Sequence, residues 1–372
     1  MARCSRPMAL LTCVFLMGCG AAKIFFQPAP PADEVVYATT PDGWRLGLDH
    51  FIPRRISKKR PPVILCHGFT YNGNFWNVER ERSFARQLAK RGYDTWVVWL
   101  RGTRKTSKQG VAESDVRTLK DNFDDYVHKD LPAIIGLVQK KTGRDKVIWI
   151  GHSMGGMVMY AYLETEKPEN IAAFVAIASP MHMPKPMNDI LENTVKNKNM
   201  LKLASAFVGT KAPSQLFGPL GKRAEVPQYQ LFHNHDNMTY GTLTRQRLYV
   251  VEDAPGGVHE QMTVFLEKGE MLSADGSVNY TKGLKKVKVP ILLVAGLVDY
   301  MAPPEVVRYT YNHVSSEDKT FRLFCTANGS KVNYGHDDLV IGKHANVEVF
   351  PYILFWLERQ CGQFNEACLL CH

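Results

Sequence analysis

Short hydrophobic runs recur along the chain, and most are followed by a stretch with helical spacing. The clearest case begins at 147–150, a run of β-branched and aromatic residues typical of a short buried strand. In the segment behind it, the apolar positions suit one face of a helix. Those positions are Met157, Val158, Tyr160, Ala161 and Leu163. This pattern predicts a strand, a sharp turn and a helix in direct succession.

The same alternation extends over most of the sequence. An alternating pattern around Asp42-Gly43 predicts a β-hairpin near the start. Strands that alternate with helices predict an α/β fold, with a mostly parallel sheet and helices on both faces. The predicted strands are 63–66, 94–99, 146–150, 171–178, 291–295 and 321–324, and the predicted helices are 77–91, 123–140 with an interruption near Pro132, 154–166 and 345–359.

The alternation breaks at 181–288, which is rich in Met, Phe, Leu, Asn and Pro. We predict a core built from 34–180 and 289–360, with 181–288 inserted as a helical cap. A cap at this place would cover the turn after 150 and shape an apolar pocket. The alternative is that its apolar residues only form the cap's own small core.

Ser153 stands at the sharp turn, in Gly151-His152-Ser153-Met154-Gly155. This G-x-S-x-G pattern, between a strand and a helix, is typical of a nucleophile elbow. Small neighbours are needed because the strand and helix backbones nearly touch there. A tight turn with a solvent-facing serine is the alternative interpretation.

A nucleophilic serine needs a base and an acid, which follow it in this architecture in the order acid, then histidine. Asp299 lies in the loop after the strand 291–295, and His336 lies in the loop after 321–324. Both are at the carboxyl ends of predicted strands, where open α/β sheets place their ligands. His344 is an alternative candidate for the base. Asp337 and Asp338, which directly follow His336, are alternative candidates for the acid.

An oxyanion hole is predicted from two backbone amides. One is that of Met154, directly after the nucleophile, and the other is that of Phe69, in the His67-Gly68-Phe69 loop after the strand 63–66. We expect His67 to be structural. An ordinary strand and glycine turn is the alternative for this segment.

The composition is that of a globular protein. Of 372 residues, 45% are hydrophobic and 22% are charged, which excludes a disordered chain. The net charge of +10 includes two basic runs, at 54–60 and 282–288, that either form solvated faces or favour an anionic lipid surface. No nucleic-acid-binding module is present, and the predicted chemistry requires neither a metal nor an organic cofactor.

The first residues have the pattern of an export signal. Arg3 and Arg6 precede an apolar stretch that is too short for an ordinary membrane-spanning helix. Residues 16–19, Leu-Met-Gly-Cys, resemble a bacterial lipobox, which would make 1–19 a signal peptide and Cys19 a lipidated residue. The Pro-rich stretch 20–33 would then tether the protein to a membrane. A secreted protein and an uncleaved anchor are the alternatives.

Cysteines gather in the last segment, 361–372. Cys361, Cys368 and Cys371 allow one disulfide, whose pairing the sequence does not reveal. The ending CLLCH also matches a c-type haem attachment pattern, but we favour a disulfide or a metal-binding tail.

The segments VVYATTPDGWRLGLDHFIP, DLPAIIGLVQKKTGRDKVIWIGHS and GHDDLVIG resemble the acid lipases, the gastric and lysosomal lipases of the α/β-hydrolase superfamily. The resemblance covers 34–180 and 288–358, and it favours His336 over His344. An Asn-x-Arg-Gly loop of that family is matched by Arg101 and Gly102, with Trp99 in place of asparagine. The cap does not resemble the family, so the substrate is the least supported part of the analogy.

The resemblance implies hydrolysis of lipid carboxylic esters by Ser153, Asp299 and His336, with the amides of Phe69 and Met154 as donors. The same triad could serve an acyltransferase or a thioesterase. A lipoprotein that binds a lipid without catalysis is the alternative from another class.

Overall fold

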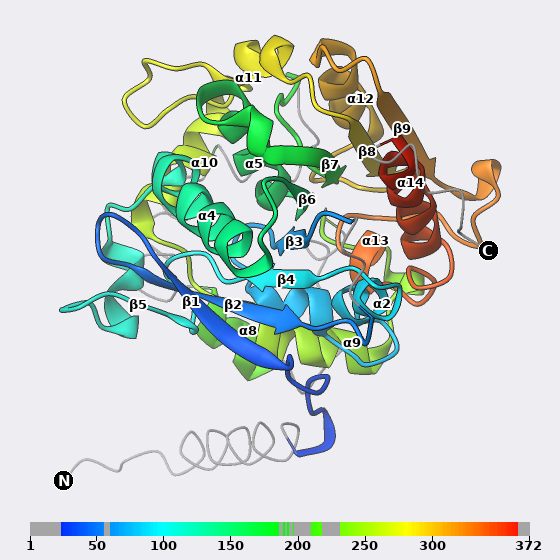
Figure 1. The fold of residues 1–372 in the computed structure, drawn as a ribbon, viewed down its shortest axis with the longest axis horizontal. Coiled ribbons are helices and arrows are strands. Elements are labelled where there is room, and N and C mark those ends of the chain that lie inside the picture. The colour runs from blue at the N-terminus through cyan, green and yellow to red at the C-terminus, as the bar shows by residue number, and fades with distance from the viewer. Residues whose placement is uncertain are drawn as a thin grey trace, which may run out of the picture.

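A computed structural model describes residues 24–55, 60–185, 189, 192, 196, 210–217 and 231–363 (Figure 1). Nine strands form one sheet: β1 Glu34–Thr39, β2 Arg45–Phe51, β3 Val63–Cys66, β4 Thr95–Val98, β5 Thr106–Ser107, β6 Val147–His152, β7 Ile171–Ile177, β8 Ile291–Gly296 and β9 Lys319–Phe324. Their order is β1-β2-β4-β3-β6-β7-β8-β9, and β5 pairs with β2.

The sheet is antiparallel at one edge and parallel elsewhere. β1 and β2 form the predicted hairpin, and Gly43 takes the left-handed conformation in its turn, with φ 89°. β2 pairs antiparallel with β4, and every later neighbour pair from β4–β3 to β8–β9 is parallel. β3, β4, β6, β7 and β8 are buried at every residue, as expected for strands covered on both faces. The predicted fold class is confirmed.

Helices cover both faces of the sheet (Figure 1). α4 (Leu131–Thr142), α5 (Met154–Thr165) and α12 (Pro304–His313) lie on one face. α2 (Phe84–Lys90) and α14 (Val349–Gln363) lie on the other, where the rings of Phe84 and Phe350 stack with centroids 4.3 Å apart. The carboxyl ends of the parallel strands therefore remain free to carry loops.

Two predicted helices differ from the structure. In place of one helix over 77–91, a short 3₁₀ helix (Gly73–Asn77) is separated from α2, because the Ser83 side chain caps α2 by accepting the Arg86 amide. The second, predicted over 123–140, ends two residues later, at Thr142. Its predicted interruption is present: α3 (Phe123–Asp125) passes into a π-helical turn (Tyr126–Asp130) just before Pro132, whose missing N–H removes one bond of the regular helix.

The loop after β4 is anchored by a buried arginine. Arg101 is fully buried, and its guanidinium bonds to Asp130 at 2.8 Å, to Asp121 at 2.5 Å and to Asp42 at 2.8 Å. Three carboxylates around one buried cation satisfy its donors and join the hairpin turn to α4. The Arg-Gly pair that carried part of the family resemblance is thus a structural element.

The described residues between β7 and β8 add only helices and isolated bridges. The helices of four residues or more are α8 Lys211–Phe217, α9 Tyr240–Arg245, the π-helix η8 Gln246–Val250, α10 Gly256–Lys268 and α11 Tyr280–Gly283. This agrees with an inserted helical cap, although the predicted limits of 181 and 288 stay predictions. Met181, Met238, Leu243 and Phe265 are buried in the same hydrophobic cluster as the sheet.

The predicted signal peptide with Cys19, and the tail cysteines Cys368 and Cys371, lie outside the described residues, as does the side chain of Cys361. Within the ranges given above, no helix combines the length and the apolar character needed to cross a bilayer. The described part of the predicted tether is held in place, since Arg245 donates to the Gln27 carbonyl at 2.7 Å and Asn77 donates to that of Pro30 at 2.9 Å.

Candidate active site

Ser153 occupies a strained turn between β6 and α5. Its backbone has φ 52° and ψ −122°, a region that residues other than glycine rarely adopt. The preceding strand is buried throughout, while Ser153 itself is half-buried. The strain projects the serine beyond the end of the strand, which is the conformation of a nucleophile elbow.

The glycines of the motif are required by contact between backbones. A Cβ at Gly151 would lie 2.2 Å from the Gly155 carbonyl oxygen, and one at Gly155 would lie 2.4 Å from that of Cys66. These positions leave no room for a methyl group. The tight packing brings α5 and its first residue, Met154, against the end of β3.

His336 and Asp299 are brought together from the loops after β9 and β8. His336 Nδ1 donates to Asp299 Oδ2 at 2.9 Å, and both side chains are buried. The other carboxylate oxygen, Oδ1, accepts the amides of Met301 at 2.9 Å and Ala302 at 2.7 Å. The carboxylate is therefore fixed by its own loop and in turn orients the imidazole.

The histidine loop also contacts the elbow directly. His152 Nε2 donates to the backbone carbonyl of His336 at 3.1 Å, and the two rings lie 4.7 Å apart. Since His152 directly precedes Ser153, this bond holds the histidine loop against the strand that leads to Ser153. The three predicted triad residues thus follow β6, β8 and β9 at the same end of the sheet, and His152 links the histidine loop to the turn of Ser153.

The charges around His336 favour the protonated form of its imidazole ring. Burial alone would lower the pKa of His336, but the Asp299 carboxylate beside it outweighs this effect, so its pKa is raised above 6.5. The neighbouring His152 has no such partner, and burial holds its pKa well below the usual value. His336 is thus the better proton acceptor of the two.

The alternative candidates for the acid and the base form other hydrogen bonds. Asp338 accepts the Gly335 amide at 2.9 Å and the Asn237 side chain at 2.8 Å, and so ties the histidine loop to the cap. Asp337 accepts hydrogen bonds from two side chains, neither of them an imidazole. The carbonyl of His344 accepts the Glu348 amide in the turn that leads into α14. Asp299 is the carboxylate that bonds to the His336 ring.

The loop after β3 lies against the nucleophile. A Cβ on Gly68 would approach Ser153 Cβ to 3.1 Å, so only glycine lets this loop pass so closely. Next to it is Phe69, the predicted donor, and Met154 is the first residue of α5, whose amide has no partner inside the helix. His67 accepts the Leu100 amide at 3.3 Å, and burial lowers its pKa to about 4, which fits a structural role.

Sequence reasoning missed the contacts of the cap with this site. Tyr71, four residues after His67, and Gln246, at the start of η8, both donate to Asp337. No local pattern joins Gln246 to a residue 91 positions away. His152, His336 and Asp337 also place one ligand atom each within 4.8 Å of one another. A metal there would compete for the imidazole that Ser153 needs, so we treat the three as hydrogen-bonding groups.

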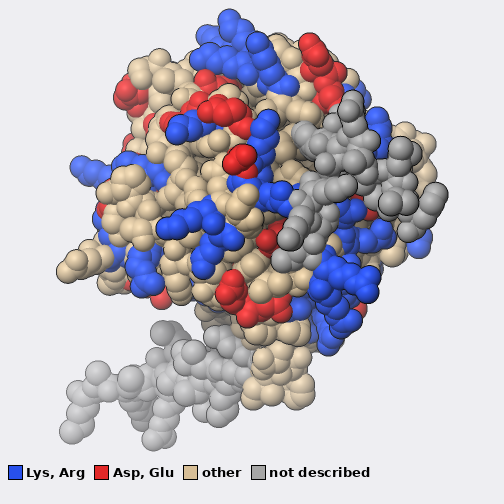
Figure 2. Space-filling view, viewed as in Figure 1, with Lys and Arg blue, Asp and Glu red and all other residues tan. Residues whose placement is uncertain are grey.

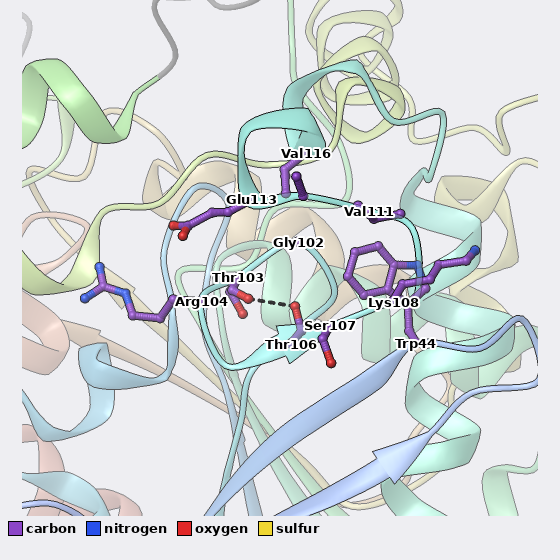
Figure 3. Close-up of a pocket in the computed structure, with 11 residues that line it drawn as sticks. Trp44, Gly102, Thr103, Arg104, Thr106, Ser107, Lys108, Val111, Glu113 and Val116 are labelled. Atoms are coloured by element: carbon purple, nitrogen blue, oxygen red, sulfur yellow. Dashed lines mark hydrogen bonds between the residues drawn. The ribbon is translucent and has the colours of Figure 1, made fainter.

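A separate open pocket of about 110 Å³ lies over the loop after β4, beside Trp44 and Lys108 (Figure 3). Thr106 donates to the Thr103 carbonyl on its floor at 2.7 Å, and the Arg104 side chain points away from the cavity. None of Ser153, Asp299 and His336 lines it. We assign no role to this pocket.

Comparisons with known proteins agree with this geometry. A probable lipase of Schizosaccharomyces pombe is 29% identical over 162 residues, which are 41% of this chain and 35% of the relative. Gastric triacylglycerol lipase of Rattus norvegicus is 32% identical over 148 residues, 37% of each protein. The chain thus matches little more than a third of the length of these curated relatives.

Among solved structures, an esterase of Thermogutta terrifontis superimposes with a TM-score of 0.59 at 16% identity, covering 88% of this chain and 99% of the esterase. At this identity the likeness concerns the fold alone. The family model of the alpha/beta hydrolase fold matches residues 61–324, which include the elbow serine and Asp299. With the sheet order, the elbow and this match in agreement, the chain belongs to the alpha/beta hydrolase fold family.

Proposed function

We propose that the protein is a serine hydrolase that cleaves carboxylic esters of lipids. The observation that carries the proposal is the buried hydrogen bond between His336 and Asp299 beside the strained turn of Ser153. A nucleophile, a base and an acid on loops at the same end of the sheet are the parts that acyl transfer requires.

In the first step, His336 Nε2 accepts the Ser153 hydroxyl proton as Oγ attacks the acyl carbonyl carbon. The imidazolium is stabilised by Asp299, whose carboxylate stays ionised. The proton then passes to the leaving alkoxide, the carbon–oxygen bond of the ester breaks, and the alcohol departs. Water, deprotonated by His336, attacks the acyl-enzyme and releases the acid and Ser153.

The negative charge that develops on the carbonyl oxygen needs donors placed in advance. The amides of Phe69 and Met154 are proposed for this task, because Met154 begins α5 directly after Ser153 and Phe69 follows Gly68, whose backbone passes close to Ser153. Each donor of this kind contributes about 3–4 kcal/mol to catalysis in other serine hydrolases.

The lipid character of the substrate is supported by the names of the curated relatives, which include a probable lipase and a gastric triacylglycerol lipase. The core cluster that reaches into the cap is apolar and includes Met181, Met183 and Met238. An acyl chain that contacts this apolar part of the cap would gain about 0.8 kcal/mol for each buried methylene group.

The proposal is tested with Ser153→Ala. Its turnover of p-nitrophenyl acyl esters should fall to background, and its labelling by a fluorophosphonate probe should vanish, while its circular dichroism stays that of the wild type. Turnover that survives the substitution would refute the mechanism. Products formed in the presence of an added alcohol separate hydrolysis from acyl transfer, and a thioester series tests the thioesterase alternative.

A further inference from the structure

One stretch of the cap lies along the loop that carries the proposed oxyanion donor. The stretch 246–252, called the brace below, comprises η8 and the two residues after it. The carbonyl of Tyr249 accepts the side-chain amides of Asn72 and Asn74, both at 2.9 Å. The amide of Glu252 donates to the Thr70 carbonyl at 2.8 Å, and its carboxylate accepts Asn72 at 2.8 Å.

These bonds meet the oxyanion loop where its backbone is strained. Thr70, next to Phe69, has φ 58°, and a β-branched residue takes this conformation only when its surroundings enforce it. Glu252 is buried and is also bonded by Arg104 and Lys211, so it is a firm support. The conformation of the Phe69–Thr70 turn is thus held from the cap side.

The first residue of the brace reaches the histidine loop as well. Gln246 Nε2 donates to Asp337 Oδ2 at 2.7 Å and to Tyr71 Oη at 3.0 Å, and Tyr71 Oη donates to the same carboxylate oxygen at 2.7 Å. All three side chains are buried. Asp337 directly follows His336, so this trio joins the cap, the oxyanion loop and the histidine loop at one point.

We propose that Gln246, Tyr71 and Asp337 are positioning residues, through which the brace aligns the oxyanion loop with His336 for catalysis. The inference rests on the proposed function, because it concerns the geometry of that same site. Gln246 opens a π-helical turn, a feature that is frequent at functional sites because it redirects a side chain out of the helical register.

The charge of Asp337 also acts on the base. Burial raises the pKa of Asp337 to about 6, against the effect of His336 and of the donors Tyr71 and Gln246, and with the further effect of Asp299. As a carboxylate, Asp337 adds to the rise in the pKa of His336 that Asp299 and Asp338 also promote. The acid limb of the pH–rate profile is the fall of kcat toward low pH. Its apparent pKa therefore depends on the protonation of His336 and Asp337 together.

The test compares Gln246→Leu, Tyr71→Phe and Asp337→Asn with a matched control, Gln261→Leu. Gln261 is an equally buried cap glutamine, with 5% of its surface exposed as for Gln246. It bonds to the core at Phe123 and Asp124, each at 3.0 Å, and has no bond to the loops of the site. Both leucine variants lose cap-to-core hydrogen bonds, but only Gln246→Leu loses those of the positioning trio.

On a short, soluble p-nitrophenyl ester, Gln246→Leu and Tyr71→Phe should lower kcat about tenfold or more with KM within about twofold, because misplacement of reacting groups acts on the chemical step. Asp337→Asn should in addition shift the acid limb of kcat to lower pH, since the imidazolium loses a nearby negative charge. Gln261→Leu should lower the melting temperature and leave both kcat and the acid limb of its pH profile unchanged.

The proposal is overturned if the trio variants keep kcat within about twofold of the control at an equal loss of thermal stability, because the trio would then be structural only. It is also overturned if Asp337→Asn leaves the acid limb in place. Absence of ester turnover and of fluorophosphonate labelling in the wild type itself would refute the proposed function instead, and so the two failures are distinguishable.

Discussion

At the scale of single residues, the protein selects one of three nearby aspartates as the partner of an imidazole. Asp299 has one oxygen bound by two amides of its own loop and the other directed at His336. Asp337 and Asp338 directly follow His336, whereas Asp299 is 37 positions away in the sequence. Even so, Asp337 Oδ2 and Asp338 Oδ1 accept hydrogen bonds from other groups. The partner of the ring is therefore set by which loop directs a carboxylate oxygen at Nδ1.

Asp299→Asn tests this selection. The asparagine oxygen is expected to stay with the amides of Met301 and Ala302, which places its NH₂ group against His336 Nδ1. The imidazole must then carry its proton on Nε2, the wrong tautomer for a base. We expect kcat to fall by about three to four orders of magnitude with the fold intact, as in the serine protease precedent.

Measurement of kcat on a soluble ester, with near-ultraviolet circular dichroism as the check on folding, decides the outcome. Asp337→Asn serves as the comparison, since it changes a carboxylate that lies nearby but bonds elsewhere. A larger loss of kcat in Asp337→Asn than in Asp299→Asn would show that the acid has been assigned to the wrong residue.

The turn at Ser153 and the pairing of His336 with Asp299 could be predicted from the sequence because each residue follows a hydrophobic run that had to be a strand. Parallel strands place their carboxyl ends at one edge, so the order along the chain brings the three loops together. Chain order ranked Asp299 above Asp337, but it could not exclude Asp337, since that depends on the direction of individual side chains. Nor could it reveal the role of Gln246, whose partners lie on loops far away in the chain.

At the scale of secondary structure, the site depends on how closely α5 crosses β3 and β6. Gly155 lies on this crossing, where an added methyl group would meet the Cys66 carbonyl oxygen at 2.4 Å and that of His67 at 2.6 Å. Both obstacles are backbone atoms and cannot rotate away. The elbow is therefore fixed by the contact between two elements as well as by its own turn.

Gly155→Ala should destabilise the protein by several kcal/mol, about 2–4, and abolish turnover, because α5 must move away from the sheet. Gly136→Ala is the matched control. Gly136 is exposed within α4 and has open space around it, so alanine should stabilise the protein by about 0.5–1 kcal/mol through its helix propensity. Urea unfolding of both variants measures the difference, and equal effects would contradict the proposed crowding at the elbow.

Another element-scale prediction concerns Glu164, near the end of α5, where it packs beside α11. Burial raises its pKa to about 9, and Lys286 only partly opposes this. A carboxyl with a raised pKa binds its proton more tightly in the folded state, so its stabilising effect is complete below 4.5 and is lost as the pH rises toward 9. Above pH 4.5, the buried Glu164 therefore lowers the free energy of unfolding by an amount that grows as the pH rises toward 9.

Glu164→Gln should remove that cost. We expect the free energy of unfolding near neutral pH to rise by about 1–3 kcal/mol, with little change near pH 4.5, because the unfolded carboxyl is ionised only above that pH. Urea unfolding at about pH 5 and about pH 8 measures the two limits. A gain that is the same at both pH values would show that Glu164 is not protonated in the folded state.

At the scale of the whole molecule, one basic cluster lies far from the N-terminal segment. Figure 2 shows Lys and Arg side chains gathered over α11 at the top of the view, where Lys282, Lys285 and Lys288 are exposed. The segment 24–31, which leads in from the N-terminus, lies at the opposite end, below α9 (Figure 1). A membrane that holds the N-terminus would therefore face the α8 and α9 side, away from this cluster.

This arrangement separates the two proposed sources of membrane attachment. We propose that Cys19 is lipidated, because residues 16–19 resemble a lipobox. Two acyl chains, each gaining about 0.8 kcal/mol for every buried methylene group, would anchor the protein stably. The described segment from Gln27 to Pro31 is bound to the cap and the core, so the anchor would also fix the orientation of the cap. The exposed lysines would then act as a solvated face.

Cys19→Ser should therefore move the protein from the membrane fraction to the soluble fraction of the cell that makes it, since it removes the thiol that carries the acyl chain. The combined variant Lys282→Ala, Lys285→Ala and Lys288→Ala should leave the partition unchanged, because those side chains are turned away from the anchored end. Fractionation followed by immunoblotting measures both. If the lysine variant is released while Cys19→Ser stays bound, attachment is electrostatic and the orientation derived from the N-terminal segment is wrong.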